Sequence, residues 1–87
     1  MQTIRIYGRE ACIWCSRAKQ LVETRSFAHS YVDVNEDVGA RAYVAEKLGT
    51  ENFTLPQIFV GETLIGGFTE LAKADKRGEL QQMIGGA

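Results

Sequence analysis

The sequence has one histidine and only two cysteines among its 87 residues, which limits the metal and disulfide chemistry that it can support. A structural zinc site takes about four ligands, mostly cysteine and histidine, so the composition argues against a zinc site within one chain. A chain with 45% hydrophobic residues also does not need a permanent structural disulfide to stabilise its fold. We therefore expect that the two cysteines are functional thiols and that the protein binds no metal.

Long apolar runs and blocks of like charge are absent as well. No segment approaches the ~20 apolar residues of a membrane-spanning helix, and the start, MQTIRIYG, shows no charged leader followed by an apolar stretch and a cleavage site. The net charge is −1, and acids and bases are mixed along the chain, without the basic block that binds nucleic acid or an anionic membrane. These absences predict a cytoplasmic protein with neither partner.

The length and composition predict one domain over residues 1–87. A chain of this size with one proline and 45% hydrophobic residues can form one packed core and is too short for two. No internal repeat or low-complexity segment divides it.

Hydrophobic patterns in the first half predict a strand, a helix, a second strand and a second helix. The first strand alternates, with Ile4 and Ile6 on one face. The helices have apolar residues at helical spacing, and Gly49 ends the second one. These elements cover residues 3–7, 13–26, 29–35 and 36–49. Such a unit implies two parallel strands joined by a right-handed crossover.

The second half predicts a hairpin and a last helix. The short runs QIFV and TLI are separated by Gly61-Glu62, the spacing of a tight antiparallel hairpin. After two glycines a helix is expected to begin near Thr69, whose hydroxyl can cap it, and Gly78 should interrupt it before a short final ELQQMI segment. The order βαβαββα predicts an α/β fold, with a four-stranded mixed sheet flanked by three or more helices.

Cys12 and Cys15 lie at the start of the first predicted helix. Such a pair can be half of a zinc site, a cluster ligand, a structural bridge, a redox couple or two incidental buried residues. At i and i+3 on a helix the two Cα atoms lie about 5–6 Å apart, which a disulfide can bridge. The helix start stabilises a thiolate, so we predict Cys12 as the nucleophile and Cys15, one turn later, as the resolving thiol.

Three ordered motifs resemble the glutaredoxin family of the thioredoxin-like fold. They are IYGREACIWCSRAK, TLPQIFVGETLIGG and GGFTEL, and the resemblance covers essentially the whole chain. It implies a glutathione-dependent thiol–disulfide oxidoreductase that reduces protein disulfides and glutathione mixed disulfides through Cys12 and Cys15, with glutathione as reductant. It also implies a monomer that acts on disulfide or glutathionylated proteins, ribonucleotide reductase among them.

The resemblance implies glutathione-binding roles for two arginines and a tryptophan. Arg9 would meet a carboxylate of the tripeptide, which suits a forked guanidinium. Trp14 would lie along the glutathione backbone, and Arg41, in the second predicted helix, would reach the glycine carboxylate. The structural alternatives are a solvated surface charge for each arginine and a half-buried core aromatic for Trp14.

The second and third motifs imply the remaining binding residues. A cis peptide at Leu55-Pro56 would keep the Leu55 backbone exposed for a strand-like pairing with the cysteinyl part of glutathione. A proline at this place also fits the ordinary first position of a strand. Gly67, Phe68 and Thr69 lie where the family holds the γ-glutamyl carboxylate, at the N-terminus of the last helix.

The sequence departs from the family pattern at three positions and leaves two rival functions open. Ile13 replaces the usual proline, Trp14 the usual tyrosine, and Phe68 the usual cysteine or serine. The missing proline at the first helical position leaves open a function as an iron–sulfur scaffold. In such a scaffold, two chains each provide Cys12 as a ligand of a 2Fe–2S cluster, and two glutathiones complete its coordination. The other rival is a redoxin reduced by thioredoxin reductase. That family carries Trp-Ser-Gly-Phe where this chain reads LIGGF, which favours glutathione binding.

Overall fold

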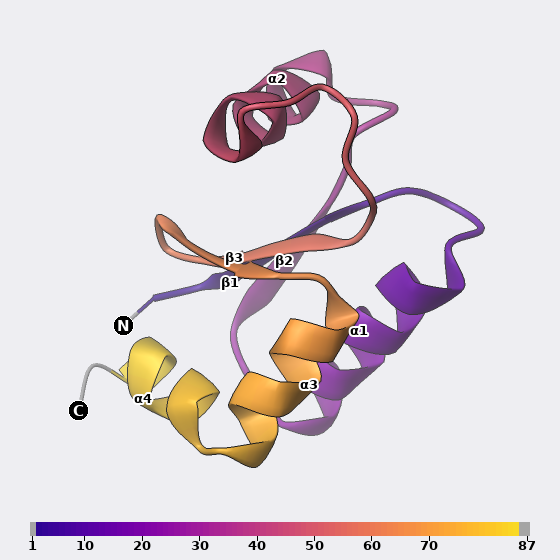
Figure 1. Ribbon diagram of the computed structural model, residues 1–87. Coiled ribbons are helices and arrows are strands. Elements are labelled where there is room, and N and C mark those ends of the chain that lie inside the picture. The colour runs from indigo at the N-terminus through magenta and orange to yellow at the C-terminus, as the bar shows by residue number, and fades with distance from the viewer. Residues whose placement is uncertain (1, 86–87) are drawn as a thin grey trace.

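The computed structural model describes residues 2–85, in which four strands form one sheet and four helices pack on it (Figure 1). The elements are β1 Ile4–Gly8, α1 Ile13–Thr24, β2 His29–Asp33, α2 Val38–Leu48, β3 Gln57–Val60, β4 Thr63–Gly66, α3 Phe68–Lys76 and α4 Glu79–Gly85. The strand order is β2-β1-β3-β4, with β1 parallel to β2 and antiparallel to β3, and β3 antiparallel to β4. The predicted α/β fold with a mixed four-stranded sheet is therefore confirmed. No helix within the described residues has the length and apolar character needed to cross a membrane.

Helix α1 ends two residues earlier than the sequence pattern predicts. Ser26 adopts a left-handed conformation with φ 60°. The N–H groups of Ser26 and Phe27 donate to the carbonyls of Glu23 and Val22, which is the pair of bonds of a Schellman motif. The motif closes the helix at Thr24. The predicted range of 13–26 was too long because a serine stands where a glycine usually marks such an end.

Helix α2 begins two residues later than the predicted range of 36–49, at Val38. Asp37 is the N-cap residue, and its Oδ1 accepts the Ala40 N–H at 3.0 Å. Gly49 ends the helix in the left-handed region with φ 71°, as predicted. Strand β2 stops at Asp33, two residues before the predicted end at residue 35, because the following residues form a turn, in which the Asp33 carbonyl accepts the N–H groups of Glu36 and Asp37.

The start of α3 corrects one prediction. Gly67 is the N-cap residue, and no side chain caps the helix from that position, so Thr69 lies inside the first turn and is not the cap. The Gly67 N–H instead donates to Glu70 Oε1 at 2.8 Å. A carboxylate within the first turn thus satisfies a terminal N–H group where the helix dipole favours negative charge. Gly78, with φ 75°, separates α3 from α4 as predicted.

The helices divide between the two faces of the sheet (Figure 1). Helices α1, α3 and α4 lie on one face, and α2 lies on the other. The buried core of the first face consists of Ile4, Ile6, Ala18, Val22, Ile58, Val60, Leu71, Leu80 and Ile84. The core beneath α2 consists of Tyr7, Val34, Val44 and Phe59. The two central strands supply apolar residues to both cores because helices cover both faces.

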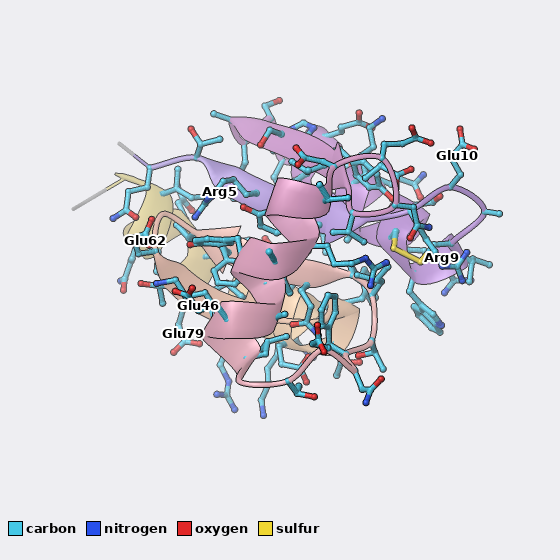
Figure 2. All side chains as sticks on the ribbon, turned by 90° about the horizontal axis from the view of Figure 1, so that it is seen from above. Arg5, Arg9, Glu10, Glu46, Glu62 and Glu79 are labelled. Carbon is cyan, nitrogen blue, oxygen red and sulfur yellow. A yellow bond between two sulfur atoms is a disulfide. The ribbon has the colours of Figure 1, made fainter. Side chains whose placement is uncertain are left out.

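A polar cluster around Arg5 links the second core to the β3–β4 hairpin. The Arg5 guanidinium lies 5.2 Å from the centroid of the Tyr43 ring, and it donates to Tyr43 Oη at 3.1 Å and to the Gly61 carbonyl. Tyr43 Oη also bonds to Glu62 Oε2 at 3.2 Å. Figure 2 shows Arg5 and Glu62 at the end of the molecule opposite to Arg9 and the disulfide. The Arg5 cluster is therefore remote from the cysteines.

Truncation of Phe59 tests the second core. Phe59 is fully buried, whereas Leu64, its partner in the β3–β4 register, is 40% exposed. We expect Phe59→Ala to lower the free energy of unfolding by about 3–5 kcal/mol through lost transfer energy and a cavity, measured by urea denaturation. Leu64→Ala should cost about 1 kcal/mol or less, because the leucine remains half in water in the native state. Similar costs for both variants would show that Phe59 is not central to this core.

Candidate active site

Cys12 and Cys15 form a disulfide at the N-terminus of α1. Their Cα atoms lie 5.2 Å apart, as the i, i+3 spacing predicts. Cys12 is the N-cap residue, and its Sγ accepts the Cys15 N–H at 3.2 Å. Because the first helical turn fixes both residues, the sulfur–sulfur bond can open and close with little backbone movement.

The two sulfurs lie in different environments. Cys12 is 8% exposed, and Cys15 is fully buried on the inner face of α1 with Ala18 and Val22. The free N–H groups and the dipole of the helix N-terminus favour a negative charge at Cys12. This arrangement suits Cys12 for attack on an external disulfide and Cys15 for attack on Cys12 from the inside.

Cys15 Sγ faces the last residue of β1. A Cβ added to Gly8 would lie 2.9 Å from Cys15 Sγ and closer still to Tyr31 Oη, so no side chain fits at this position. The Tyr31 hydroxyl donates to the Arg9 carbonyl at 2.8 Å. Burial raises the pKa of Tyr31, so the phenol stays a neutral donor near neutral pH. Bare backbone and a phenol therefore form the wall beside Cys15.

The loop of residues 9–12 joins β1 to α1 through a strained backbone. Ala11 has φ 54°, a left-handed conformation that costs a residue with a side chain about 1–2 kcal/mol. Arg9 Nη1 donates to the carbonyls of Glu10 at 2.9 Å and Ala11 at 3.2 Å, and Tyr31 donates to the carbonyl of Arg9. Hydrogen bonds to these successive carbonyls support the strained conformation.

A groove of about 250 Å³ lies beside the C-x-x-C motif. The Leu55-Pro56 bond that contributes to it is cis, as the resemblance implies. The Trp14 and Phe68 rings, which both line the groove, pack together with centroids 5.6 Å apart. The lining consists of Trp14, Thr54, Leu55, Pro56, Gly67, Phe68, Thr69 and Glu70. The fold thus brings together six of the residues that the sequence proposes for glutathione binding.

Two residues of this groove were not predicted as site residues. Glu70 places a carboxylate at the start of α3, where its Oε1 accepts the Gly67 N–H. Its position three residues after the N-cap, which is typical of a capping box, is the signal that identifies it. The Thr54 carbonyl accepts Gln57 Nε2 at 2.9 Å, which anchors the loop before Pro56. Nothing in the sequence indicates that contact.

The two arginines predicted to bind glutathione do not line the groove. Arg9 is exposed and donates to carbonyls of its own loop. Arg41 donates to Asn35 Oδ1 at 2.7 Å and to the Val34 carbonyl at 3.4 Å, and its guanidinium lies 5.7 Å from the Phe53 ring centroid. Arg9 uses only Nη1 in these bonds, whereas Arg41 uses both Nε and Nη2.

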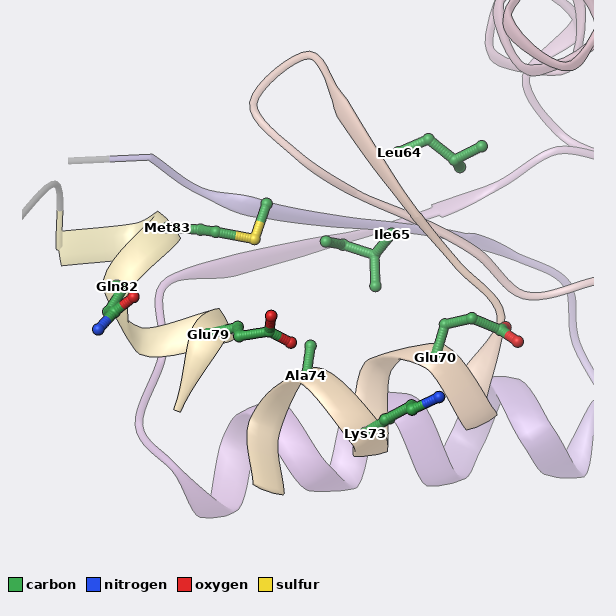
Figure 3. A pocket seen from close by; sticks show the side chains of 8 residues that line it. All are labelled: Leu64, Ile65, Glu70, Lys73, Ala74, Glu79, Gln82 and Met83. Carbon is green, nitrogen blue, oxygen red and sulfur yellow. The ribbon is translucent and has the colours of Figure 1, made fainter. Parts of the chain in front are cut away.

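A larger hollow of about 440 Å³ lies between β4, α3 and α4 (Figure 3). Its lining consists of Leu64, Ile65, Glu70, Lys73, Ala74, Glu79, Gln82 and Met83. It shares only Glu70 with the groove, and no residue of the C-x-x-C motif lines it, whereas Trp14 of that motif lines the groove. From residue 2 to residue 85, no three His, Cys, Asp or Glu side chains are grouped so that they could hold a metal ion. The groove beside Trp14 is therefore the candidate site for cysteine chemistry.

Known sequences resemble this chain over most of its length. The family model described as Glutaredoxin matches residues 4–65. The chain is 40% identical over 77 residues to glutaredoxin 1 of Escherichia coli K12, covering 83% of this chain and 89% of that protein. It is 31% identical over 84 residues to a glutaredoxin of Neisseria meningitidis serogroup A, covering 97% of this chain and 98% of the relative.

Solved structures resemble the fold over a similar span. The solution structure of glutaredoxin from Brucella melitensis matches with a TM-score of 0.78 and 31% identity, covering 97% of this chain and 89% of that one. The crystal structure of a buckwheat glutaredoxin–glutathione complex matches with a TM-score of 0.80 and 21% identity, covering 95% of this chain and 76% of that one. At 21% identity the second match shows the fold alone.

The close approach at Gly8 gives a test of the active-site packing. We expect Gly8→Ala to lower the free energy of unfolding of the oxidised protein by about 1–3 kcal/mol, because the new methyl group overpacks the space beside Cys15 and Tyr31. Gly39→Ala in α2 is the control, since a Cβ there would meet only Asp37 Oδ1 at 3.4 Å. That variant should be neutral or gain about 0.5–1 kcal/mol from the removal of a helical glycine. Equal stability of the two variants would refute the packing argument.

Proposed function

The chain belongs to the glutaredoxin family of thiol–disulfide oxidoreductases, and from this premise we propose that it uses glutathione to reduce protein disulfides and glutathione mixed disulfides. The observation that carries the proposal is the groove beside the Cys12–Cys15 disulfide. Three segments far apart in the sequence meet there: Trp14 from the cysteine motif, the Leu55-Pro56 loop, and residues 67–69 at the start of α3.

The reaction starts at Cys12. In the reduced enzyme the Cys12 thiolate attacks one sulfur of a protein disulfide and forms a mixed disulfide, and the other substrate sulfur leaves as a thiolate and takes a proton from water. Cys15, after losing its proton to water, then attacks Cys12 Sγ. This step forms the Cys12–Cys15 disulfide and releases the second substrate thiol. Two glutathione molecules reduce that disulfide and become one glutathione disulfide.

The groups of glutathione match those of the groove. The Leu55 backbone, placed before the cis-proline Pro56, can pair with the cysteinyl part of the tripeptide as a strand does. Phe68 and Thr69 lie in the first turn of α3, whose N–H groups have no partners within the helix and suit the γ-glutamyl carboxylate. The Glu70 carboxylate, whose Oε1 accepts the Gly67 N–H, can pair with the γ-glutamyl ammonium group.

Arg9 is the arginine that we propose to bind a carboxylate of glutathione. Its guanidinium donates to neutral carbonyls at an exposed position, and a carboxylate is a stronger acceptor than a carbonyl. Arg41 also bonds to Asn35 and lies against the Phe53 ring, so its movement toward a ligand costs more contacts. Arg41 stays a prediction of the resemblance.

The proposal extends to location, partners and the rival functions. We propose a cytoplasmic monomer that acts on disulfide or glutathionylated proteins, with ribonucleotide reductase as one partner to test. A redoxin of the other type would accept electrons from thioredoxin reductase. An iron–sulfur scaffold would be brown and would absorb visible light after anaerobic purification.

A coupled assay tests the proposed function directly. Reduction of hydroxyethyl disulfide is followed as NADPH consumption, once with glutathione and glutathione reductase and once with thioredoxin reductase alone. We expect turnover in the first mixture and none above background in the second. Turnover only with thioredoxin reductase would assign the chain to the rival redoxin type.

Replacement of each cysteine tests their different roles. Cys12→Ser should abolish all reductase activity, because it removes the nucleophile at the helix N-terminus. Cys15→Ser should keep deglutathionylation, in which glutathione resolves the mixed disulfide, and should lose most reduction of protein disulfides. Rates with a glutathionylated peptide and with a disulfide protein measure the two activities. The same loss in both variants would remove the assigned asymmetry.

Replacement of Arg9 tests recognition of the glutathione carboxylate. Arg9→Ala should raise the KM for a glutathionylated peptide by about threefold to tenfold, with a smaller change in kcat, because a charge-assisted contact is lost. Arg77→Ala is the matched control, because Arg77 lies at the C-terminal end of α3 and the groove lies at its N-terminal end. This variant should leave KM unchanged. An uncharged disulfide separates binding from reactivity. An equal defect with that substrate would mean that Arg9 acts on the Cys12 thiolate, and no defect with either substrate would mean that it is a solvated charge.

A further inference from the structure

We propose that Tyr31 is a positioning residue for the dithiol reaction, because it holds the loop that places Cys12 next to Cys15. This inference rests on the proposed function, in which the enzyme closes a Cys12–Cys15 disulfide. Tyr31 lies on β2, opposite Ile6 in the register of β1 and β2. It belongs to none of the three sequence motifs, and it does not line the groove.

The Tyr31 side chain lies against the loop before Cys12, the space beside Cys15, and helix α1. Its hydroxyl donates to the Arg9 carbonyl in the loop before Cys12 at 2.8 Å. Its Oη and Cys15 Sγ both approach the place where Gly8 lacks a side chain. Lys19 Nζ of α1 lies 5.6 Å from the centroid of the Tyr31 ring. One side chain thus links β2 to the loop and lies against the helix that carries both cysteines.

The loop needs such support because its backbone is strained. Ala11, directly before Cys12, is held at φ 54°, and a residue in that conformation persists only where its surroundings enforce it. In the oxidised protein the disulfide ties Cys12 to the first turn of α1. In the reduced protein that tie is gone, and the loop then depends on its hydrogen bonds: those of Arg9 and Tyr31 to its carbonyls, and that of the Ser16 N–H to the Cys12 carbonyl.

The Tyr31 hydrogen bond and the disulfide therefore support each other. Each one restricts the loop and lowers the conformational entropy that the other must remove. In the reduced protein the hydrogen bond is made for less of the time, so its loss costs less there than in the oxidised protein. The coupling is reciprocal. Loss of the Tyr31 hydroxyl must weaken the disulfide by the same factor by which the disulfide strengthens the hydrogen bond.

The same restriction acts on the resolving step. Cys15 loses its proton to water, and its sulfur attacks Cys12 Sγ. The bond between Cys12 and the substrate sulfur breaks, the Cys12–Cys15 bond forms, and the substrate leaves as a thiolate that is protonated by water. A freer loop presents Cys12 to Cys15 in the right orientation less often, which slows this intramolecular step. Resolution by external glutathione does not involve Cys15 and should not change.

The reduction potential of the Cys12–Cys15 pair is the decisive measurement. Tyr31→Phe keeps the ring and removes only the hydroxyl. We expect the equilibrium constant for reduction of the disulfide, measured in glutathione or dithiothreitol buffers, to rise about threefold to tenfold. At about 30 mV per tenfold for a two-electron couple, the potential rises by about 15–30 mV.

Tyr43→Phe is the matched control. It also removes one hydrogen-bonded tyrosine hydroxyl, but in the Arg5 cluster at the opposite end of the molecule (Figure 2). Its potential should equal that of the unchanged protein. A potential of Tyr31→Phe that equals the control value, or lies below it, overturns the proposal.

Two further readouts separate positioning from a merely structural role. Tyr31→Phe should destabilise the oxidised protein more than the reduced protein. The ratio of the two losses in folding equilibrium constant should equal the factor by which the reduction equilibrium changes. A purely structural tyrosine would lower the folding equilibrium constant of both forms equally. With a disulfide protein as substrate, quenched samples of the variant should contain more Cys12 mixed disulfide, while deglutathionylation keeps its rate. If the unchanged protein lacks glutathione-dependent turnover, the proposed function fails, and the potentials still decide the role of Tyr31.

Discussion

The antiparallel register between β1 and β3 is the constraint on which the site depends. Tyr7, next to the end of β1, pairs with Gln57 at the start of β3, and Ile58 pairs with Gly66 at the end of β4. This register sets the cis-proline loop before β3 and the start of α3 after β4 at the edge of the sheet where β1 leads into the cysteine loop. A shift of the register by one residue would turn the strand side chains to the wrong faces and would also separate the three segments of the groove.

Local sequence signals were sufficient for the order of elements and for the cysteine pair. Alternation at Ile4 and Ile6 indicated the buried face of β1, and Gly49 and Gly78 marked helix ends that the structure confirms. Two of the errors arose where another residue takes the role of the expected one. Ser26 takes the left-handed position of a glycine, and the Glu70 side chain does for the start of α3 what the hydroxyl of Thr69 was expected to do.

Side-chain contacts of the site were less predictable than its backbone. The groove residues were assigned through the family resemblance. They come from three segments far apart in the sequence, which only the fold brings together. A long charged side chain such as Arg41 can contact several different partners, and here it contacts Asn35 and Phe53 and does not line the groove. The approach of Tyr31 to Cys15 over Gly8 joins two strands and a helix, so no spacing along the chain could reveal it.

The central claim is that the groove formed by three segments holds glutathione while it is attached to Cys12. The most direct test compares backbone amide NMR spectra of Cys15→Ser before and after glutathionylation of Cys12. The account predicts that, beyond the neighbours of Cys12, the largest shifts fall on Leu55, Gly67, Phe68 and Thr69. Shifts that are confined to the neighbours of Cys12, or that are largest in α2 or in the hollow between β4, α3 and α4, would contradict it.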